Sequence, residues 1–200
     1  MRPNNLQETQ KRIAAAPAGC VFVASDFADI AETRRINVCL ERMANENMIS
    51  RIMRGVYYKP EYSKLLGENV APAADAVAHA IARNYGWTIV PCGDTALNIL
   101  GLSTQVPSVW SYVSDGTYKK YSYDNTTISF KRTTNKEISR LSEKTAIVIQ
   151  ALKALGKEHI TDETNAKIRS ALTDTERETM LSEAKYATAW IYEIIKDICR

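Results

Sequence analysis

The sequence predicts an α+β protein with a small N-terminal domain of helices and a hairpin, followed by a mixed α/β C-terminal domain with a helical end. Three observations lead to this fold class. Two helical runs lie between residues 25 and 45, a strand-like run broken by Gly55 follows them, and the chain turns helical from residue 137. We expect the first domain to span residues 1–62 and the second to span residues 70–200.

The second helical run, which begins at Thr33, carries the clearest periodicity. Thr33 can cap it, and Ser25 can cap the short run 26–30 before it, because each hydroxyl can accept a bond from a backbone N–H group. Apolar side chains recur at the helical period and predict one buried face, made of Ile36, Cys39, Leu40 and Met43. The outward face comprises Arg34, Val38, Glu41 and Asn45, flanked by Arg35, Asn37 and Arg42.

A hairpin is predicted after this helix. Two strand-like runs, 48–54 and 56–60, flank Gly55, which supplies a backbone conformation that a tight connection needs. A first helix is expected over 6–16, and the apolar run 20–23 either adds a strand to the hairpin or packs beneath it. Together these elements predict a winged helix-turn-helix domain, whose second helix docks in the major groove of DNA with its first turn against the base edges.

Basic residues concentrate in this part of the chain. Between residues 34 and 64 there are seven Lys or Arg and three acidic residues, a local net charge of +4, whereas the whole chain carries +3. Such a concentration is typical of surfaces that bind DNA phosphates. The alternative is a protein-interaction module, because winged domains can also bind proteins and a charged helix face is often only solvated; the helix that contains Trp190 would then contribute to the partner surface.

Composition narrows the class of protein. Hydrophobic residues make up 45% of the 200 residues and charged residues 24%, as in ordinary globular chains. The N-terminus has no apolar signal region and no apolar run reaches the roughly 18 residues of a membrane span, so we expect a cytoplasmic protein with no membrane contact. The four cysteines form no C-x-x-C pair, which favours reduced thiols and no metal site.

Catalytic motifs are scarce, so the sequence predicts no enzyme, no catalytic residue and no cofactor. The histidines, His79 and His159, lack metal-ligand spacing, and the Gly156-Lys157 pair lacks the rest of a phosphate-binding loop. An enzyme of unrecognised type is a third alternative. A tyrosine and lysine run over residues 118–123 suits base stacking in single-strand binders, but strand alternation favours packing for it.

The rest of the chain predicts a connector over 63–69, closed by Pro72, and then regular elements. Helices are expected over 73–85, 95–100 (capped by Asp94), 138–155, 162–172, 174–181 and 182–199, and strands over 87–90, 106–113, 119–123 and 126–131. The last two strands form a hairpin around Asp124-Asn125.

Several segments in order resemble the AbiEi-type antitoxins of bacterial type IV toxin-antitoxin (abortive-infection) systems, particularly a branch of transcriptional regulators. The resemblance rests on residues 40–43, 49–57, 93–107, with its Gly-Leu-Ser-Thr-Gln-Val-Pro stretch, and 114–116, and it extends through 128–131 to 189–191. It covers most of the chain. Family members often have a Gly between helix and wing, where this chain has Asn45-Glu46-Asn47; Asn tolerates the left-handed conformation, so we expect the turn to persist.

The resemblance implies a winged domain that binds double-stranded DNA at an inverted-repeat operator and represses its own operon, and a C-terminal domain that carries antitoxicity. It implies a nucleotidyltransferase-like toxin, whose effect is opposed without a stable complex, and an operator symmetry that a homodimer would match. By position, the recognition-helix role falls on Arg34, Arg35, Asn37 and Val38, and the wing role on Arg51, Arg54 and Tyr57. Their neighbours Thr33, Arg42 and Lys59 complete the expected DNA-binding set.

Overall fold

A computed structural model of the chain describes residues 5–65, 67–134, 138 and 140–200. The fold is mixed α+β, with 50% helix and 19% strand, and its C-terminal end is helical, as the sequence predicts. The chain forms two compact units, Met1–Trp87 and Thr88–Arg200. The boundary expected between residues 62 and 70 therefore lies inside the first unit, and the helix over 74–85 belongs to that unit.

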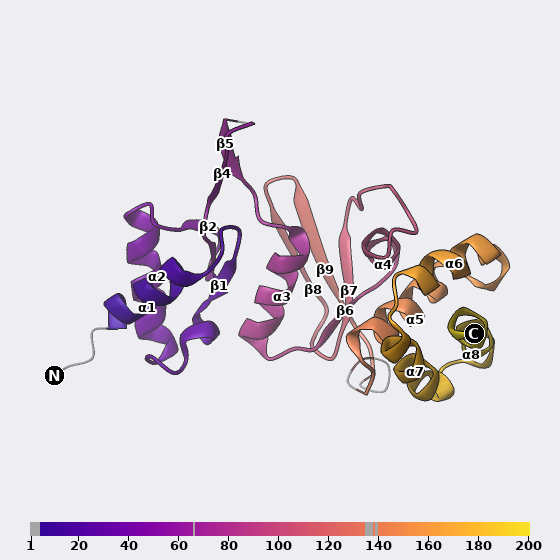
Figure 1. The fold of residues 1–200 in the computed structure, drawn as a ribbon. Coiled ribbons are helices and arrows are strands. Elements are labelled where there is room, and N and C mark those ends of the chain that lie inside the picture. The colour runs from indigo at the N-terminus through magenta and orange to yellow at the C-terminus, as the bar shows by residue number, and fades with distance from the viewer. Residues whose placement is uncertain (1–4, 66, 135–137, 139) are drawn as a thin grey trace. The chain divides into compact units, whose positions relative to one another are not determined.

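The described residues of the first unit form three α-helices, one 3-10 turn and five strands (Figure 1). They are α1 (Asn5–Ala15), β1 (Val21–Val23), η1 (Ala24–Phe27), α2 (Thr33–Asn45), β2 (Ser50–Met53), β3 (Val56–Tyr58), β4 (Glu61–Ser63), β5 (Glu68–Val70) and α3 (Ala74–Tyr85). Strands β1, β3 and β2 form an antiparallel sheet in that order. The apolar run 20–23 thus adds a strand to the hairpin, which is one of the two arrangements considered from the sequence.

Helix α2 buries the face that its periodicity predicts. Ile36, Leu40 and Met43 are fully buried and share a cluster with Phe27 of η1 and Ile13 of α1, whereas Cys39, expected on the same face, is only half-buried. Burying apolar area on one stripe of a helix is the main source of its stability in a small domain. The core of the first unit therefore fixes which face of α2 points to solvent.

Both expected N-caps differ from the structure. Ser25 lies inside η1, and Thr33 is the first helical residue of α2, after Glu32, without a capping bond from a side chain. The first turn begins earlier than expected, at Ala24, and the backbone N–H of the preceding Val23 donates to the Asp26 carboxylate over 2.9 Å, as the third residue of a helix often accepts.

The other end of α2 confirms the expected turn. Asn47 adopts the left-handed conformation with φ +58°, and the N–H of Met48 donates to the carbonyl of Met43 over 2.9 Å. This is the bonding pattern with which many helices end, and Asn takes the place that Gly usually occupies. The chain is thereby reversed toward β2.

Most of the segment expected as a connector, 63–69, is instead part of a second hairpin; residue 66 lies outside the described residues. Strands β4 and β5 pair antiparallel, with Tyr62 opposite Asn69, and Gly67 lies in the turn with φ +71°. Its side chains are largely exposed, and Figure 1 shows the hairpin projecting from the rest of the first unit.

The second unit joins a four-stranded sheet to a helical end. Its elements are β6 (Ile89–Pro91), α4 (Asp94–Ile99), β7 (Trp110–Ser114), β8 (Lys119–Tyr123), β9 (Thr126–Arg132), α5 (Glu143–Leu155), η3 (Lys157–His159), α6 (Asp162–Ser170), α7 (Asp174–Glu183), η4 (Ala184–Tyr186) and α8 (Ala189–Cys199). In the sheet, whose order is β6-β7-β9-β8, β7 and β9 run parallel and the other neighbours run antiparallel. The hairpin around Asp124-Asn125 is confirmed.

Several boundaries in this unit differ from expectation. The strand expected over 106–113 begins only at Trp110, and the strand expected over 87–90 begins at Ile89. The helix expected over 138–155 begins at Glu143, where Ser142 caps it, and residues 137 and 139 lie outside the described residues. Asp94 is the first residue of α4 and does not cap it. The helix expected over 182–199 is interrupted by η4, so that α8 starts only at Ala189.

Helix α5 is the centre of the second unit. Its residues from Thr145 to Leu152 are all buried, between a cluster shared with α6, α7 and α8 and a second cluster shared with β6 and α4. Among the described residues, no helix combines the length and apolar character that a membrane span requires.

Candidate nucleic-acid interface

The outward face of α2 presents the side chains that the sequence assigns to DNA. Exposed side chains of the set on this helix are Thr33, Arg34, Arg35, Asn37, Val38 and Arg42; Arg34, Val38 and Arg42 lie opposite the buried stripe, and Thr33 and Asn37 lie nearer its edge. Their position follows from the 3.6-residue period, because burying Ile36, Leu40 and Met43 leaves these side chains directed to solvent. The structure therefore leaves all six helix residues of the expected set accessible, and it brings Arg34, Val38 and Arg42 to one face.

Three arginines near this surface are unengaged. Within the described ranges, neither a hydrogen bond nor an ion pair involves the side chain of Arg34, Arg35 or Arg54. Arg42 differs, since its Nε donates to Glu46 over 2.9 Å, a bond that raises the pKa of the guanidinium. Both partners are exposed, so the pair contributes little to stability.

The hairpin adds two further cations. Arg51 lies on β2 and Arg54 in the turn before Gly55, whose φ is +79°, and both arginine side chains are exposed. The Arg51 Nε makes one long contact of 3.4 Å with the carbonyl oxygen of Met53. The Arg54 side chain at this turn is therefore accessible to a phosphate group.

Tyr57 does not share this exposure. Only 4% of it is accessible, and it packs in the same cluster as Ile36 and Leu40, so its role is to support the face. Burial is the main cause that raises the pKa of Tyr57; Arg51 opposes the rise and Glu41 adds to it. Because Tyr57 shares one buried cluster with Ile36 and Leu40, the helix and the hairpin lie side by side on a common core.

Lys59 is also engaged within the protein. Its Nζ donates to the backbone oxygens of Ala14 and Ala16, each 2.8 Å away, at the C-terminal end of α1. A cation at this end of a helix satisfies carbonyls that have no helical partner and complements the helix dipole. The structure therefore buries Tyr57, and it leaves Lys59 half-buried with its ammonium bonded within the protein.

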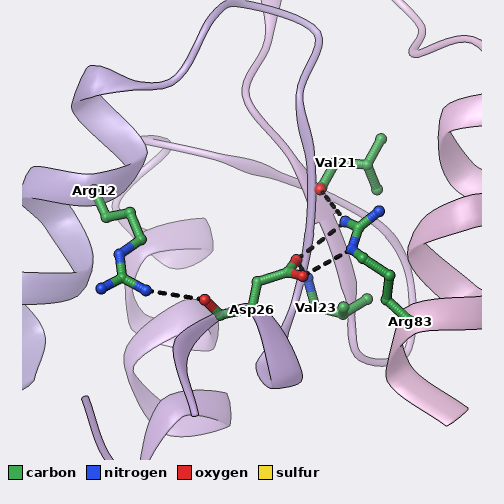
Figure 2. Close-up of polar contacts among 5 residues, drawn as sticks. All are labelled: Arg12, Val21, Val23, Asp26 and Arg83. Carbon is green, nitrogen blue, oxygen red and sulfur yellow. Dashed lines mark hydrogen bonds and ion pairs between the residues drawn. The ribbon is translucent and has the colours of Figure 1, made fainter. Parts of the chain in front are cut away.

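Asp26 positions the helices behind this face, as Figure 2 shows. Its carboxylate accepts from Arg83 of α3 at 2.8 and 3.2 Å and from the Val23 N–H, while its backbone oxygen accepts from Arg12 of α1 at 3.0 Å. Arg83 also donates to the carbonyl oxygen of Val21, 3.2 Å away. One short segment thus ties α1, β1 and α3 together, and no motif in the sequence signals this arrangement.

The second unit places its tyrosines mainly in packing positions. Tyr121 meets Phe130 edge to face with ring centroids 6.1 Å apart, and Tyr123 is buried, whereas Tyr118 is exposed. Trp190 is half-buried against the cluster of α5 to α8. These contacts agree with the packing interpretation of Tyr121 and Tyr123 and show that Trp190 packs partly against the core.

Glu183 of α7 anchors the start of α5. Its two carboxylate oxygens accept from the backbone N–H of Ser142, each over 3.0 Å, and one also accepts from the Ser142 hydroxyl over 2.8 Å. Burial alone would raise the pKa of Glu183, but hydrogen bonds from Thr145 and Ser142 outweigh it and lower the pKa. Glu183 also lines a cavity of about 700 Å³, together with Arg140, Lys153 and Tyr186.

No metal centre is formed in the described part of the chain, where no three His, Cys, Asp or Glu side chains come together in a way that could hold an ion. Both histidines bond a carbonyl one helical turn earlier: His79 Nδ1 lies 3.0 Å from the oxygen of Asp75, and His159 Nδ1 lies 3.1 Å from that of Leu155. The most developed candidate site is therefore the cationic surface of α2 and β2.

Fold and surface define a two-unit α+β protein whose N-terminal unit exposes an arginine-bearing helix beside a short hairpin. Comparison with known proteins gives the family. Residues 8–180 match the model of DUF6088, described as a family of unknown function, and the chain belongs to that family. No curated protein matches the chain.

Proposed function

We propose that the first unit is a winged helix-turn-helix domain that binds double-stranded DNA, and that the chain represses its own operon as the antitoxin of a type IV toxin-antitoxin system. The observation that carries the DNA-binding part is the set of exposed, unengaged arginines Arg34, Arg35 and Arg54 around one rigid core. Arginines without an internal partner are free to exchange water for phosphate or base edges.

Helix α2 enters the major groove in this proposal. Arg34, Arg35 and Asn37 lie in its first turns, the part of a recognition helix that meets base edges, and Arg51 and Arg54 at the hairpin hold the phosphate backbone. Arginine pairs best with guanine and asparagine with adenine, so this face supplies sequence-dependent contacts as well as charge. A homodimer would place two such helices on an inverted repeat.

The antitoxin part rests on the resemblance to AbiEi-type antitoxins. In this division of labour the second unit counteracts a nucleotidyltransferase-like toxin, through the toxin itself or its target, and no catalytic residue or cofactor is involved. A full-length Arg34→Ala/Arg35→Ala variant should then lose repression and still protect cells that express the cognate toxin. Loss of protection in that variant would show that antitoxicity acts through transcription.

A protein-interaction role is the second candidate, because one surface of the first unit favours it. Tyr62 and Leu65 on the β4–β5 hairpin are 64% and 94% exposed. Two-stranded hairpins are marginally stable alone, so a protein partner would stabilise this one. Tyr62→Ser/Leu65→Ser should leave DNA affinity unchanged if the hairpin binds protein.

The test of DNA binding compares two double variants that lose equal charge. Fluorescence anisotropy would measure the affinity of the full chain for a duplex from its own upstream region, against a scrambled duplex. Arg34→Ala/Arg35→Ala should weaken binding by about 1–3 kcal/mol for each base that an arginine recognises, whereas the exposed control Lys157→Ala/Lys185→Ala should change little. Equal weakening in both would mean that net charge alone is responsible, and the assignment of α2 would fail.

A further inference from the structure

One apolar side chain stands out on the cationic face of α2. Val38 is 62% exposed and lies two residues from both Ile36 and Leu40, on the side of the helix away from the buried stripe. Arg34 precedes it by one turn and Arg42 follows it by one turn. Val38 is therefore the apolar centre of an otherwise polar surface.

Nothing in the described part of the folded chain accounts for valine at this position. A β-branched residue is a poorer helix former than alanine, because the preceding turn restricts its side chain. With most of its surface in water, Val38 contributes little to the core in return. A contact with a ligand would cover it, and the arginines around it select a polyanion.

We infer that Val38 recognises the 5-methyl group of thymine in the major groove, which rests on the proposed DNA-binding function. The thymine methyl is the one apolar group that B-DNA presents there, and side chains with methyl groups are its usual partners. Arg34 and Asn37 lie within one turn of Val38, so in this inference they meet bases next to that thymine. The half-site bound by α2 therefore contains a thymine whose methyl group, beyond its hydrogen-bonding edge, is required for full affinity.

Replacement of thymine by deoxyuridine isolates this contact, since it removes one methyl group and keeps every hydrogen bond. The full chain would first select its preferred duplexes from a random-sequence pool, and each thymine of the selected site would then be replaced in turn. We expect one position in the half-site at which deoxyuridine weakens binding about fourfold, as the loss of one buried methyl group implies.

Two variants assign that effect to the side chain. Val38→Ser, which has no methyl group, should bind the thymine and deoxyuridine duplexes equally, whereas Val38→Thr, which has one methyl group, should still prefer thymine. Both should unfold at temperatures close to the wild type, because position 38 is exposed.

The outcomes separate this inference from the proposed function. Wild-type binding that is equal for thymine and deoxyuridine at every position overturns the inference and leaves DNA binding standing, as does a thymine preference that persists in Val38→Ser. Failure to select any duplex from the pool overturns the proposed function and the inference with it.

Discussion

Replacing Asp26 by alanine should destabilise the first unit by about 2–3 kcal/mol. The Asp26 carboxylate accepts from the N–H of Val23 over 2.9 Å and from Arg83 over 2.8 and 3.2 Å. Strand β1 is an edge strand, and both members of this ion pair bond to its backbone. The Asp26 carboxylate accepts from the N–H of Val23, and Arg83 donates to the carbonyl oxygen of Val21. Alanine at position 26 removes the acceptor for both Val23 and Arg83.

The expected loss of stability in Asp26→Ala has two parts. Val23 is fully buried, and a buried donor without a partner costs about 1–3 kcal/mol. The ion pair contributes less, at most about 1 kcal/mol, because 47% of the Arg83 side chain and 21% of the Asp26 side chain are exposed to screening solvent. Arg83→Ala is the matched control, since it removes the ion pair but leaves Val23 bonded to Asp26.

Hydrogen exchange with mass spectrometry measures this effect unit by unit in the full chain. A destabilisation of 2–3 kcal/mol corresponds to about 30- to 150-fold faster exchange at the slowest amides of α1 and α2, with little change in α5. Arg83→Ala should accelerate the same amides less than about tenfold. If Asp26→Ala has no larger effect than Arg83→Ala, the carboxylate is not satisfying a buried donor and the reasoning is refuted.

A fragment that ends at Trp87 should melt cooperatively by circular dichroism, whereas one that ends at Lys64 lacks α3 and should be less stable; equal stabilities would contradict the division into units. Arg51→Ala/Arg54→Ala should weaken binding to all duplexes and reduce the slope of log affinity against log salt by about two at most, and an unchanged slope would remove the hairpin from the DNA. The pKa of Glu183 is lowered on folding, so its carboxylate stabilises the folded state fully at a pH above the ordinary pKa of 4.5. This stabilisation is lost as the pH falls through the pKa of the folded state. Glu183→Gln should therefore flatten the acid side of an unfolding titration, and an unaltered profile would show that the carboxylate is not anchoring α5.

The sequence predicts the elements whose signals are local. The buried face of α2 follows from helical spacing alone, and the turn at Asn47 follows from the tolerance of Asn for positive φ. Gly86 ends α3 and Gly101 follows α4, both with positive φ as a helix C-terminus requires. Spacing and backbone preference can be recognised in a dozen residues without knowing what packs against them.

Contacts between residues that are far apart in the chain determine the features that local patterns do not predict. The resemblance assigns Tyr57 to DNA by position, yet β3 is the middle strand of its sheet, and both Val56 and Tyr57 are buried there, so alternation does not show which side chain is accessible. Arg83 lies 57 residues from Asp26, and no local pattern links them. Strand β5 has no buried face, so its composition indicates only a connector.

The exposed residues of the candidate site are easier to predict than the buried and bonded residues that hold them in place. Arg34, Arg35 and Val38 are exposed because the predicted buried stripe of α2 is correct, and helical geometry does the rest. Lys59 shows the limit of an argument from charge, since a lysine in a basic segment can equally satisfy carbonyls at a helix end. Charge counts locate a surface but do not say which cations are free.

Footprinting of the purified full-length chain on the DNA upstream of its own gene tests the central claim most directly. The account predicts protection of an inverted repeat with half-sites spaced by about one helical turn or a multiple of it, and this protection should disappear on substitution of Arg34 and Arg35. No protection by the folded protein at concentrations where a nonspecific DNA binder already associates would contradict the claim that α2 and its hairpin form a DNA-binding surface.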